Sequence, residues 1–185
     1  QRQMCIRDRG YLLASQTMLF VPTGRGNPIG LDRNTGRLAK TFGGAGGAFA
    51  VLLEDELFSG TGNDGTLTAN SVKLSGSLAT FKGNALAASP QHSYLLDENG
   101  VRAIDRQAYR RASAAAKRAA KRIETLKAEL KKPGLSRERR AGLQRQLGQL
   151  GETLDAAKRS KSAAEQWKLS APGRHSIIAL ANCVV

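Results

Sequence analysis

The stretch Met18–Val21 (MLFV), followed by Ile29–Asp32 (IGLD), is the first of three related stretches that decide the fold. In each, a short apolar run contains one aromatic residue and precedes a second run that ends in Asp or Asn. The three aromatic residues lie 38 and 36 residues apart, and they precede the Asp or Asn by 12, 12 and 11 residues. These pairs are Phe20 with Asp32, Phe58 with Asn70, and Tyr94 with Asp105. A repeat of about 40 residues therefore organises this part of the chain.

Short β-strands separated by turns are predicted for each unit, because short apolar runs alternate with glycine, asparagine and aspartate. We expect strands at residues 11–14, 18–21, 29–31 and 38–42 in the first unit, at 49–53, 57–59, 66–69 and 78–81 in the second, and at 93–96 and 101–105 in the third. Four short strands in about 40 residues is the period of a β-propeller blade. A small Greek-key barrel with a helical insertion is the alternative, which the regular spacing disfavours.

Turn residues separate these strands. Asp32 and Gly36 bound the turn of the first unit, and Asn99 with Gly100 belongs to a predicted hairpin turn in the third. Asp105 stands in the third unit where Asp32 stands in the first. We expect both aspartates to fix turns by accepting hydrogen bonds from backbone amides. Residues 63–65 are expected to form the turn before the third strand of the second unit.

Residues 106–166 interrupt the third unit where the first unit has its turn, and Trp167–Ser170 then supplies the missing fourth strand. The interruption is thus an insertion of about 50 residues in an exposed hairpin turn, where insertions cost little. The predicted fold is mainly β with an inserted α-helical hairpin. Residues 10–105 and 167–185 would form a partial β-propeller of about 2.5–3 four-stranded blades. Residues 176–179 and 182–185 would begin a further blade, and because a closed ring needs roughly 4–8 blades we expect a fragment of a larger protein.

Residues 1–9 are excluded from this interpretation. From Met4 they resemble the translation of a sequencing adapter, which occurs at the ends of assembled metagenomic reads, and a disordered basic arm is the alternative. Without them Cys183 is the sole cysteine, so no disulfide within the chain is expected.

An antiparallel coiled coil of two helices is predicted for residues 106–166, because apolar residues recur at alternating spacings of four and three. Pro133 and Gly134 end the first helix, and Ser136 is the expected N-cap of the second. So short a link makes the helices pack against each other. The expected seam consists of Ala112, Ala116, Ala119, Ile123, Leu126 and Leu130, and of Leu143, Leu147, Leu150, Leu154 and Ala157.

Positive charge is concentrated in this insertion. The chain has a formal net charge of +14, and residues 106–166 hold 17 Lys/Arg against 6 Asp/Glu. Either a solvated coiled-coil surface or a contact site for an acidic protein or an anionic membrane surface explains the pattern. Specific nucleic-acid binding is disfavoured, because Tyr109 is the only aromatic residue among these charges. The candidate contact residues are Arg110, Arg111, Lys117, Arg118, Lys121, Arg122, Arg137, Arg139 and Arg140.

No motif predicts a catalytic, cofactor or metal site. Residues 43–47 are rich in glycine but lack the Gly-Lys-Ser/Thr ending of a phosphate-binding loop, and they are interpreted as a linker between units. His92 and His175 have no further ligand at metal-binding spacing. Residues 54–56 are acidic and could hold a cation, but such a run is typical of a hairpin tip. The sequence favours a non-enzymatic role for this chain and leaves an enzymatic one open.

The units resemble the quinoprotein-like (pyrroloquinoline-quinone-like) β-propeller repeat, in which Ala-x-Asp-x-x-Thr-Gly precedes a tryptophan. Residues 30–36 (GLDRNTG) match this motif in part, with Lys40 at the tryptophan position. The second unit keeps Ala69-Asn70, and the third has Ala103-Ile104-Asp105 with Trp167 beyond the insertion.

This resemblance implies a non-catalytic scaffold that binds a protein partner, holds no cofactor, and works outside the cytoplasm, in the periplasm or cell envelope, as the outer-membrane assembly lipoproteins of this family do. The first alternative is part of a pyrroloquinoline-quinone-dependent dehydrogenase whose quinone is bound by blades absent here. The second is a substrate-recognition accessory of an enzyme whose catalytic domain lies beyond this fragment. The fold alone does not decide among these functions.

Overall fold

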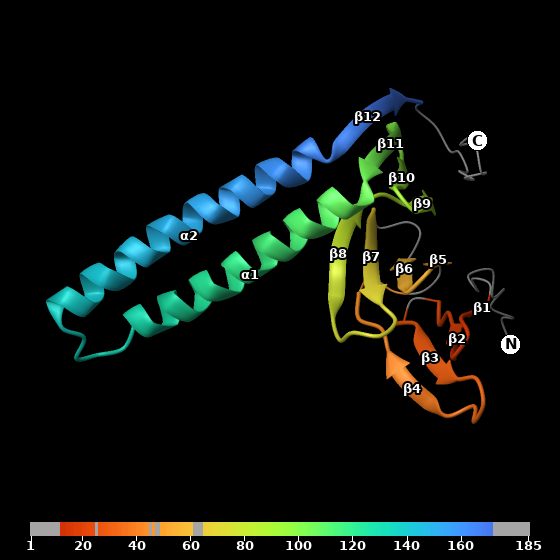
Figure 1. Ribbon diagram of the computed structural model, residues 1–185, viewed down its shortest axis with the longest axis horizontal. Coiled ribbons are helices and arrows are strands. Elements are labelled where there is room, and N and C mark those ends of the chain that lie inside the picture. The colour runs from red at the N-terminus through yellow and green to blue at the C-terminus, as the bar shows by residue number, and fades with distance from the viewer. Residues whose placement is uncertain (1–11, 25, 45, 47–48, 61–64, 172–185) are drawn as a thin grey trace, which may run out of the picture. The chain divides into compact units, whose positions relative to one another are not determined.

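The computed structural model describes residues 12–24, 26–44, 46, 49–60 and 65–171, and the described chain is mainly β (Figure 1). It forms three four-stranded antiparallel sheets and two long helices. One compact unit is Gln1–Arg106 with Gln166–Val185, and the other is Gln107–Glu165. The expectations for residues 1–9, Tyr11, 63–64 and 172–185, including His175 and Cys183, lie outside the described residues.

Each sheet is a simple meander in which neighbours along the chain pair with each other. The first sheet contains β1 (Leu13–Ala14), β2 (Met18–Val21), β3 (Ile29–Asp32) and β4 (Leu38–Thr41). The second contains β5 (Phe49–Leu53), β6 (Glu56–Gly60), β7 (Thr66–Ser71) and β8 (Ser77–Lys82). The third contains β9 (Ala85–Ala88), β10 (His92–Asp97), β11 (Gly100–Asp105) and, after both helices, β12 (Glu165–Ser170). Trp167 therefore lies on the fourth strand of the third sheet, as predicted.

No pattern in the sequence predicts β9. Three of its four residues are alanine, which is depleted in strands because its small side chain packs little surface on a sheet. Pairing with β10 along residues 85–88 holds this strand in place instead. Tertiary pairing thus overrides a weak local preference.

The three sheets share one cross-strand pattern. The aromatic residue of the second strand lies opposite a small residue of the third strand: Phe20 pairs with Gly30, Phe58 with Ala69, and Tyr94 with Ala103. In the first two sheets a register shift follows this small residue directly, between Gly30 and Leu31 and between Ala69 and Asn70. A small residue leaves room for the ring, and at Gly30 a Cβ atom would collide with the Met18 side chain and crowd Phe42.

A second aromatic residue, on or next to the fourth strand, completes the pattern. Ring centroids are 5.4 Å apart for Phe20 and Phe42, 6.1 Å for Phe58 and Phe81, and 6.1 Å for Tyr94 and Trp167. Tilted rings at such distances attract each other beyond the apolar area that they bury. The aromatic pair is therefore the unit that the sequence repeats, and it spans each sheet.

Asn70 differs from its predicted counterpart Asp32. Asp32 pairs with Met18, two residues before the aromatic residue of its strand, whereas Asn70 pairs with Leu57, one residue before Phe58. Successive residues of a strand point to opposite faces, so a one-residue change in position reverses the side chain. Asn70 is accordingly buried, and its Nδ2 donates to the Gly43 carbonyl at 2.8 Å.

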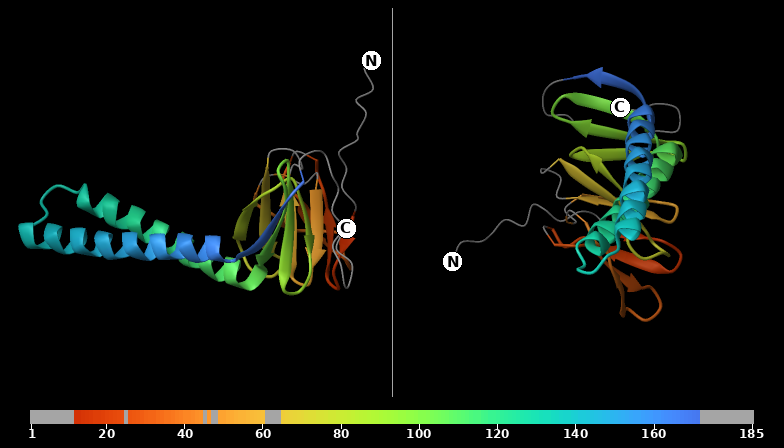
Figure 2. Two further views of the ribbon diagram at one scale, coloured as in Figure 1. Left: turned by 90° about the horizontal axis from the view of Figure 1, so that it is seen from above. Right: turned by 90° about the vertical axis from the view of Figure 1, so that its left-hand side faces the viewer.

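The second sheet lies between the other two (Figure 2), and its strand β6 is buried on both faces. All five residues of β6 are buried, which requires cover on both sides because neighbouring side chains alternate in direction. On one side Phe20 and Phe42 pack with Leu57 and Val72 in a single cluster. Towards the third sheet Phe58 and Phe81 are both fully buried.

Two glycines allow each sheet to approach the next. Gly44 follows Phe42 by two residues, has φ of +137°, and would place a Cβ atom 2.7 Å from Thr68 of the second sheet. Gly83 follows Phe81 by two residues, has φ of +154°, and would place one 3.4 Å from Leu95 of the third sheet. A side chain is strained at such φ values, so glycine is favoured at both positions.

The helices are α1 (Arg106–Leu130) and α2 (Arg137–Ala163), and they run antiparallel. Near the connecting turn the Arg139 Nη2 atom lies 2.6 Å from Glu129 Oε1, and at the opposite end Lys161 Nζ lies 4.7 Å from the centroid of the Tyr109 ring. Ser136 caps α2, since its side chain accepts from the Arg139 amide at 3.2 Å. The buried side chains of this unit are Tyr109, Ala112, Ala119, Leu126, Leu143, Ala157 and Ala164. Neither helix has the length and apolar composition that crossing a membrane requires.

Candidate functional site

Six of the predicted basic contact residues lie on α1, between Arg110 and Arg122. Arg110, Lys117 and Lys121 follow one another at spacings of seven and four, and Arg111, Arg118 and Arg122 do the same. Such spacings keep residues on one side of a helix, so the six side chains form two adjacent rows. We call them the basic rows. Arg110 is half-buried and the other five residues are exposed.

The basic rows are separated from the apolar seam of the same helix. Ala112, Ala119 and Leu126 are buried, while the rows lie on the remaining surface. No acidic residue precedes Glu124 in α1, so the first part of this helix carries an excess of positive charge. The rows therefore present dense positive charge at the solvent boundary, where it attracts anionic groups.

The three arginines near the connecting turn differ in their surroundings. Arg137, Arg139 and Arg140 all lie in the first turn of α2, where the helix dipole disfavours positive charge. Arg139 donates to Glu129, and this hydrogen bond, with the arginine charge, lowers the pKa of the Glu129 carboxyl. All three arginines are exposed, and Arg139 joins the two helices through Glu129.

The aromatic ring of Tyr109 is not exposed among the charged side chains. Its side chain is buried, with Lys161 over the ring. A base could stack only on an exposed ring, so Tyr109 does not supply the platform that nucleic-acid recognition would use.

The predicted turn residues occupy three kinds of position. Asp32 Oδ1 accepts from the amides of Asn34 and Thr35 at 3.0 and 2.8 Å and from the Thr35 hydroxyl at 2.8 Å. These bonds, with the Thr35 hydroxyl foremost, lower the pKa of the Asp32 carboxyl. Gly36 in the same turn has φ of +68°. Asp105 instead ends β11 opposite His92 and directly precedes α1.

The other two turn residues hold the end of β12. The Asn99 amide donates to Asp97 Oδ1 at 2.8 Å, and the Asn99 carbonyl accepts from the Ala171 amide at 3.1 Å. Gly100 has φ of +134°, and a Cβ atom there would collide with the Leu169 carbonyl oxygen. A glycine at this point therefore lets β12 run close against β11.

Lys40 connects the first sheet to the second. Its Nζ atom donates to the carbonyl oxygens of Ser71, Val72 and Leu74 at 2.7, 3.3 and 2.6 Å, at the end of β7 and in the loop that follows it. The same atom lies 4.9 Å from the centroid of the Phe42 ring. Partial burial lowers the pKa of the Lys40 ammonium group. Lys40 thus has a structural role where the repeat motif would place a tryptophan.

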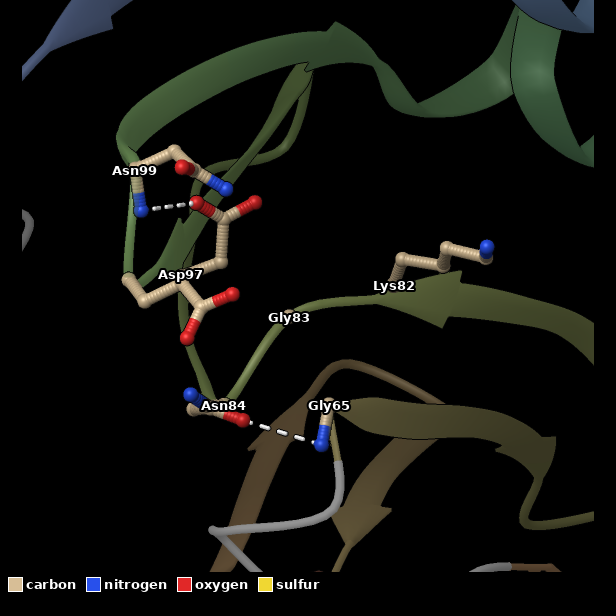
Figure 3. A pocket seen from close by; sticks show the side chains of 7 residues that line it. Gly65, Lys82, Gly83, Asn84, Asp97 and Asn99 are labelled. Carbon is tan, nitrogen blue, oxygen red and sulfur yellow. Dashed lines mark hydrogen bonds between the residues drawn. The ribbon is translucent and has the colours of Figure 1, made fainter.

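A shallow polar pocket of about 320 Å³ lies between the second and third sheets (Figure 3). It is lined by Gly65, Lys82, Gly83, Asn84, Asp97, Glu98 and Asn99. Asn84 Oδ1 accepts from the Gly65 amide at 2.9 Å, and Arg102 Nε lies 3.6 Å from Asp97 Oδ2. The polar groups in these contacts therefore bind other residues of the chain around the pocket.

The acidic run forms the hairpin between β5 and β6, as its composition suggested. Glu54 has φ of 52°, Asp55 pairs with Lys73 at 2.7 Å, and Glu56 is buried on β6. Arg106 Nη2 lies 3.4 Å from Glu54 Oε2, while its Nε and Nη1 atoms are buried without a hydrogen-bond partner in the described chain. Within that part of the chain, no three His, Cys, Asp or Glu residues group as metal ligands.

No known protein-family profile matches the chain, and no curated protein matches it. Among solved structures, the chain is similar to the computationally designed Ika4 protein, with a TM-score of 0.44 and 18% identity over 52% of this chain and 65% of the designed protein. It is also similar to BamB from Moraxella catarrhalis, with a TM-score of 0.44 and 20% identity over 54% of this chain and 33% of BamB. The chain therefore spans less than two thirds of either protein that it matches.

Proposed function

We propose that this chain is a non-catalytic scaffold, built as part of a β-propeller, and that an antiparallel coiled coil inserted in its third blade binds an acidic protein. The observation that supports the binding role is the pair of basic rows on α1, because five of their six residues are exposed and no acidic residue precedes Glu124. The propeller assignment is supported by the shared cross-strand pattern and the aromatic pair of every sheet.

An acidic protein is favoured over a membrane surface by the distribution of apolar side chains. Helices that lie in a membrane interface bury an apolar face among the lipid chains. In this hairpin the large apolar side chains Tyr109, Leu126 and Leu143 are buried. The exposed side of α1 therefore offers charge without an apolar surface to insert, which suits a carboxylate-rich protein surface.

The experiment neutralises one row and measures binding to a defined acidic probe. The variant Arg111→Gln/Arg118→Gln/Arg122→Gln removes three positive charges, and the control Arg145→Gln/Lys158→Gln/Arg159→Gln removes the same charge from α2. Binding to poly-L-glutamate is measured by titration calorimetry at two salt concentrations. At about 0.2–1 kcal/mol for each exposed pair, loss of the row weakens binding about threefold to more than a hundredfold.

Two outcomes contradict this function. One is equal weakening in both triple variants, because general charge rather than the basic rows would then bind the probe. The other is binding to vesicles with a quarter of phosphatidylserine, lost with the row, in the absence of binding to poly-L-glutamate. That result would identify an anionic membrane as the partner.

A place in the cell envelope and the two enzyme-linked alternatives rest on the resemblance of the repeat units alone. Stoichiometric binding of free pyrroloquinoline quinone to this chain, measured by calorimetry, would contradict a scaffold that holds no cofactor.

A further inference from the structure

Among the described residues, each of the two outer sheets has one exposed face whose counterpart in the second sheet is covered. Within the chain the aromatic pair of one sheet packs on the next sheet, so that Phe20 and Phe42 are each 1% exposed against Leu57 and Val72. Phe58 and Phe81 are likewise fully buried. In the third sheet the equivalent Trp167 is 45% exposed, and Leu169 on the same strand is 59% exposed. We call the side of the third sheet that carries Tyr94 and Trp167 the aromatic face.

The first sheet, on the other side of the second sheet, exposes an aliphatic surface instead of an aromatic one. Four residues lie side by side across its strands: Ala14 pairs with Leu19, Leu19 with Leu31, and Leu31 with Leu38. We call them the aliphatic row. Leu38 is 63% exposed, Ala14 is exposed, and Leu19 and Leu31 are half-buried.

The second sheet shows what normally covers such a row. Leu57 is equivalent to Leu19, because each directly precedes the aromatic residue of its strand. Asn70 is equivalent to Leu31, because Asn70 pairs with Leu57 and Leu31 pairs with Leu19. Leu57 is fully buried and packs with Phe20 and Phe42 of the preceding sheet. The aliphatic row of one sheet is therefore a surface that an aromatic pair covers elsewhere in this chain.

We propose that the aromatic face of one copy of this chain docks on the aliphatic row of a second copy. The contact would repeat the packing of the first sheet on the second, with Tyr94 and Trp167 in place of Phe20 and Phe42. Because the two surfaces differ, the association is head-to-tail, and it closes into a ring or continues according to the rotation between copies. Partly exposed tryptophan is also the residue type that most often dominates the energy of an interface.

This proposal goes beyond the scaffold role, because it concerns the sheets and needs no acidic partner. It is tested on the full 185-residue chain by sedimentation velocity over a range of concentrations. Trp167→Glu places a carboxylate in the aromatic face, and Leu38→Glu places one in the aliphatic row. Both side chains are exposed, so both variants should keep the far-ultraviolet circular dichroism of the unmodified chain.

The matched control is Leu74→Glu. Leu74 is 65% exposed in the loop between β7 and β8, and it belongs to neither surface. We expect the unmodified chain and the Leu74→Glu variant to assemble alike as concentration rises. Trp167→Glu and Leu38→Glu should each require at least about tenfold more protein to associate, which corresponds to about 1.4 kcal/mol.

Mixing the two variants separates this arrangement from other self-association. A Leu38→Glu copy keeps its aromatic face, and a Trp167→Glu copy keeps its aliphatic row, so an equimolar mixture retains one intact contact and should form a species of two chains. A symmetric contact through one surface gives no such recovery. The proposal would be overturned if the unmodified chain stayed monomeric over the whole concentration range, or if the mixture of the two variants showed no pairing.

Discussion

Lys40 provides the sharpest test of how the sheets are held together. Replacing it with methionine removes the donor to three carbonyl oxygens while keeping most of the aliphatic chain. The Leu74 carbonyl is exposed, so water replaces that bond, whereas the 2.7 Å bond to the Ser71 carbonyl is partly buried. A hydrogen bond to a charged group contributes about 1.5–3 kcal/mol, and an exposed cation over a ring adds about 0.5–1 kcal/mol. We therefore expect Lys40→Met to lower the free energy of unfolding by about 2–3 kcal/mol.

The matched control is Lys73→Met in the loop that Lys40 contacts. Lys73 pairs with Asp55 at 2.7 Å, but the two side chains are 73% and 56% exposed, so this pair contributes about 0–1 kcal/mol. Both variants lose one charge, and both are unfolded in urea with Trp167 fluorescence and circular dichroism as the signals. At about 1–3 kcal/mol per molar urea, Lys40→Met shifts the midpoint by about 0.7–3 M. Equal midpoints for the two variants would refute the structural role assigned to Lys40.

Three further substitutions probe other parts of the unit. Phe58→Ala removes a fully buried ring and should cost about 3–5 kcal/mol in urea unfolding; a loss below about 1 kcal/mol would contradict its central position. Gly100→Ala should separate the end of β12 from β11, because the new Cβ atom meets the Leu169 carbonyl, and a red shift of Trp167 emission reports this; unchanged emission would speak against the close approach. Asp32 has a lowered pKa in the folded chain, so its carboxylate stabilises above the unfolded pKa of about 4, and this contribution disappears as pH falls through the folded pKa. The stability difference between the unmodified chain and Asp32→Asn should therefore be larger at pH 7 than in acid, and a difference independent of pH would be inconsistent with this assignment.

The sequence predicted most strands because apolar runs and turn residues mark them locally. The aromatic positions Phe20, Phe58 and Tyr94 were found from spacing alone, and Trp167 was assigned to its strand despite the insertion. What the spacing could not reveal was register. Asn70 matched Asp32 by its distance from the aromatic residue, yet the two pair differently across the sheet and point to different faces.

The contacts between sheets were less accessible to sequence reasoning. The sequence marks Lys40 only as a residue at the tryptophan position of the repeat motif. Its ammonium group joins two sheets through backbone carbonyls that no sequence pattern identifies. Gly44 and Gly83 each lie two residues after an aromatic residue, Phe42 and Phe81, and the sequence shows this shared position. Only the structure shows its meaning, which is the close approach of neighbouring sheets at both glycines. The basic rows could be read from the sequence, whereas the burial of Tyr109 depends on packing between the helices.

The insertion of two helices of 25 and 27 residues between β11 and β12 bears on how the third sheet folds. If the intervening chain were a flexible loop, lengthening it from about 4 to about 60 residues would add roughly 2.4 kcal/mol of closure entropy before β12 could pair. Antiparallel helices of nearly equal length bring the chain back to where it left, so a helical hairpin that forms first removes most of this cost. Helices form in about a microsecond, sooner than most sheets assemble. The last strand of the sheet would then arrive through local helix formation instead of a long random search.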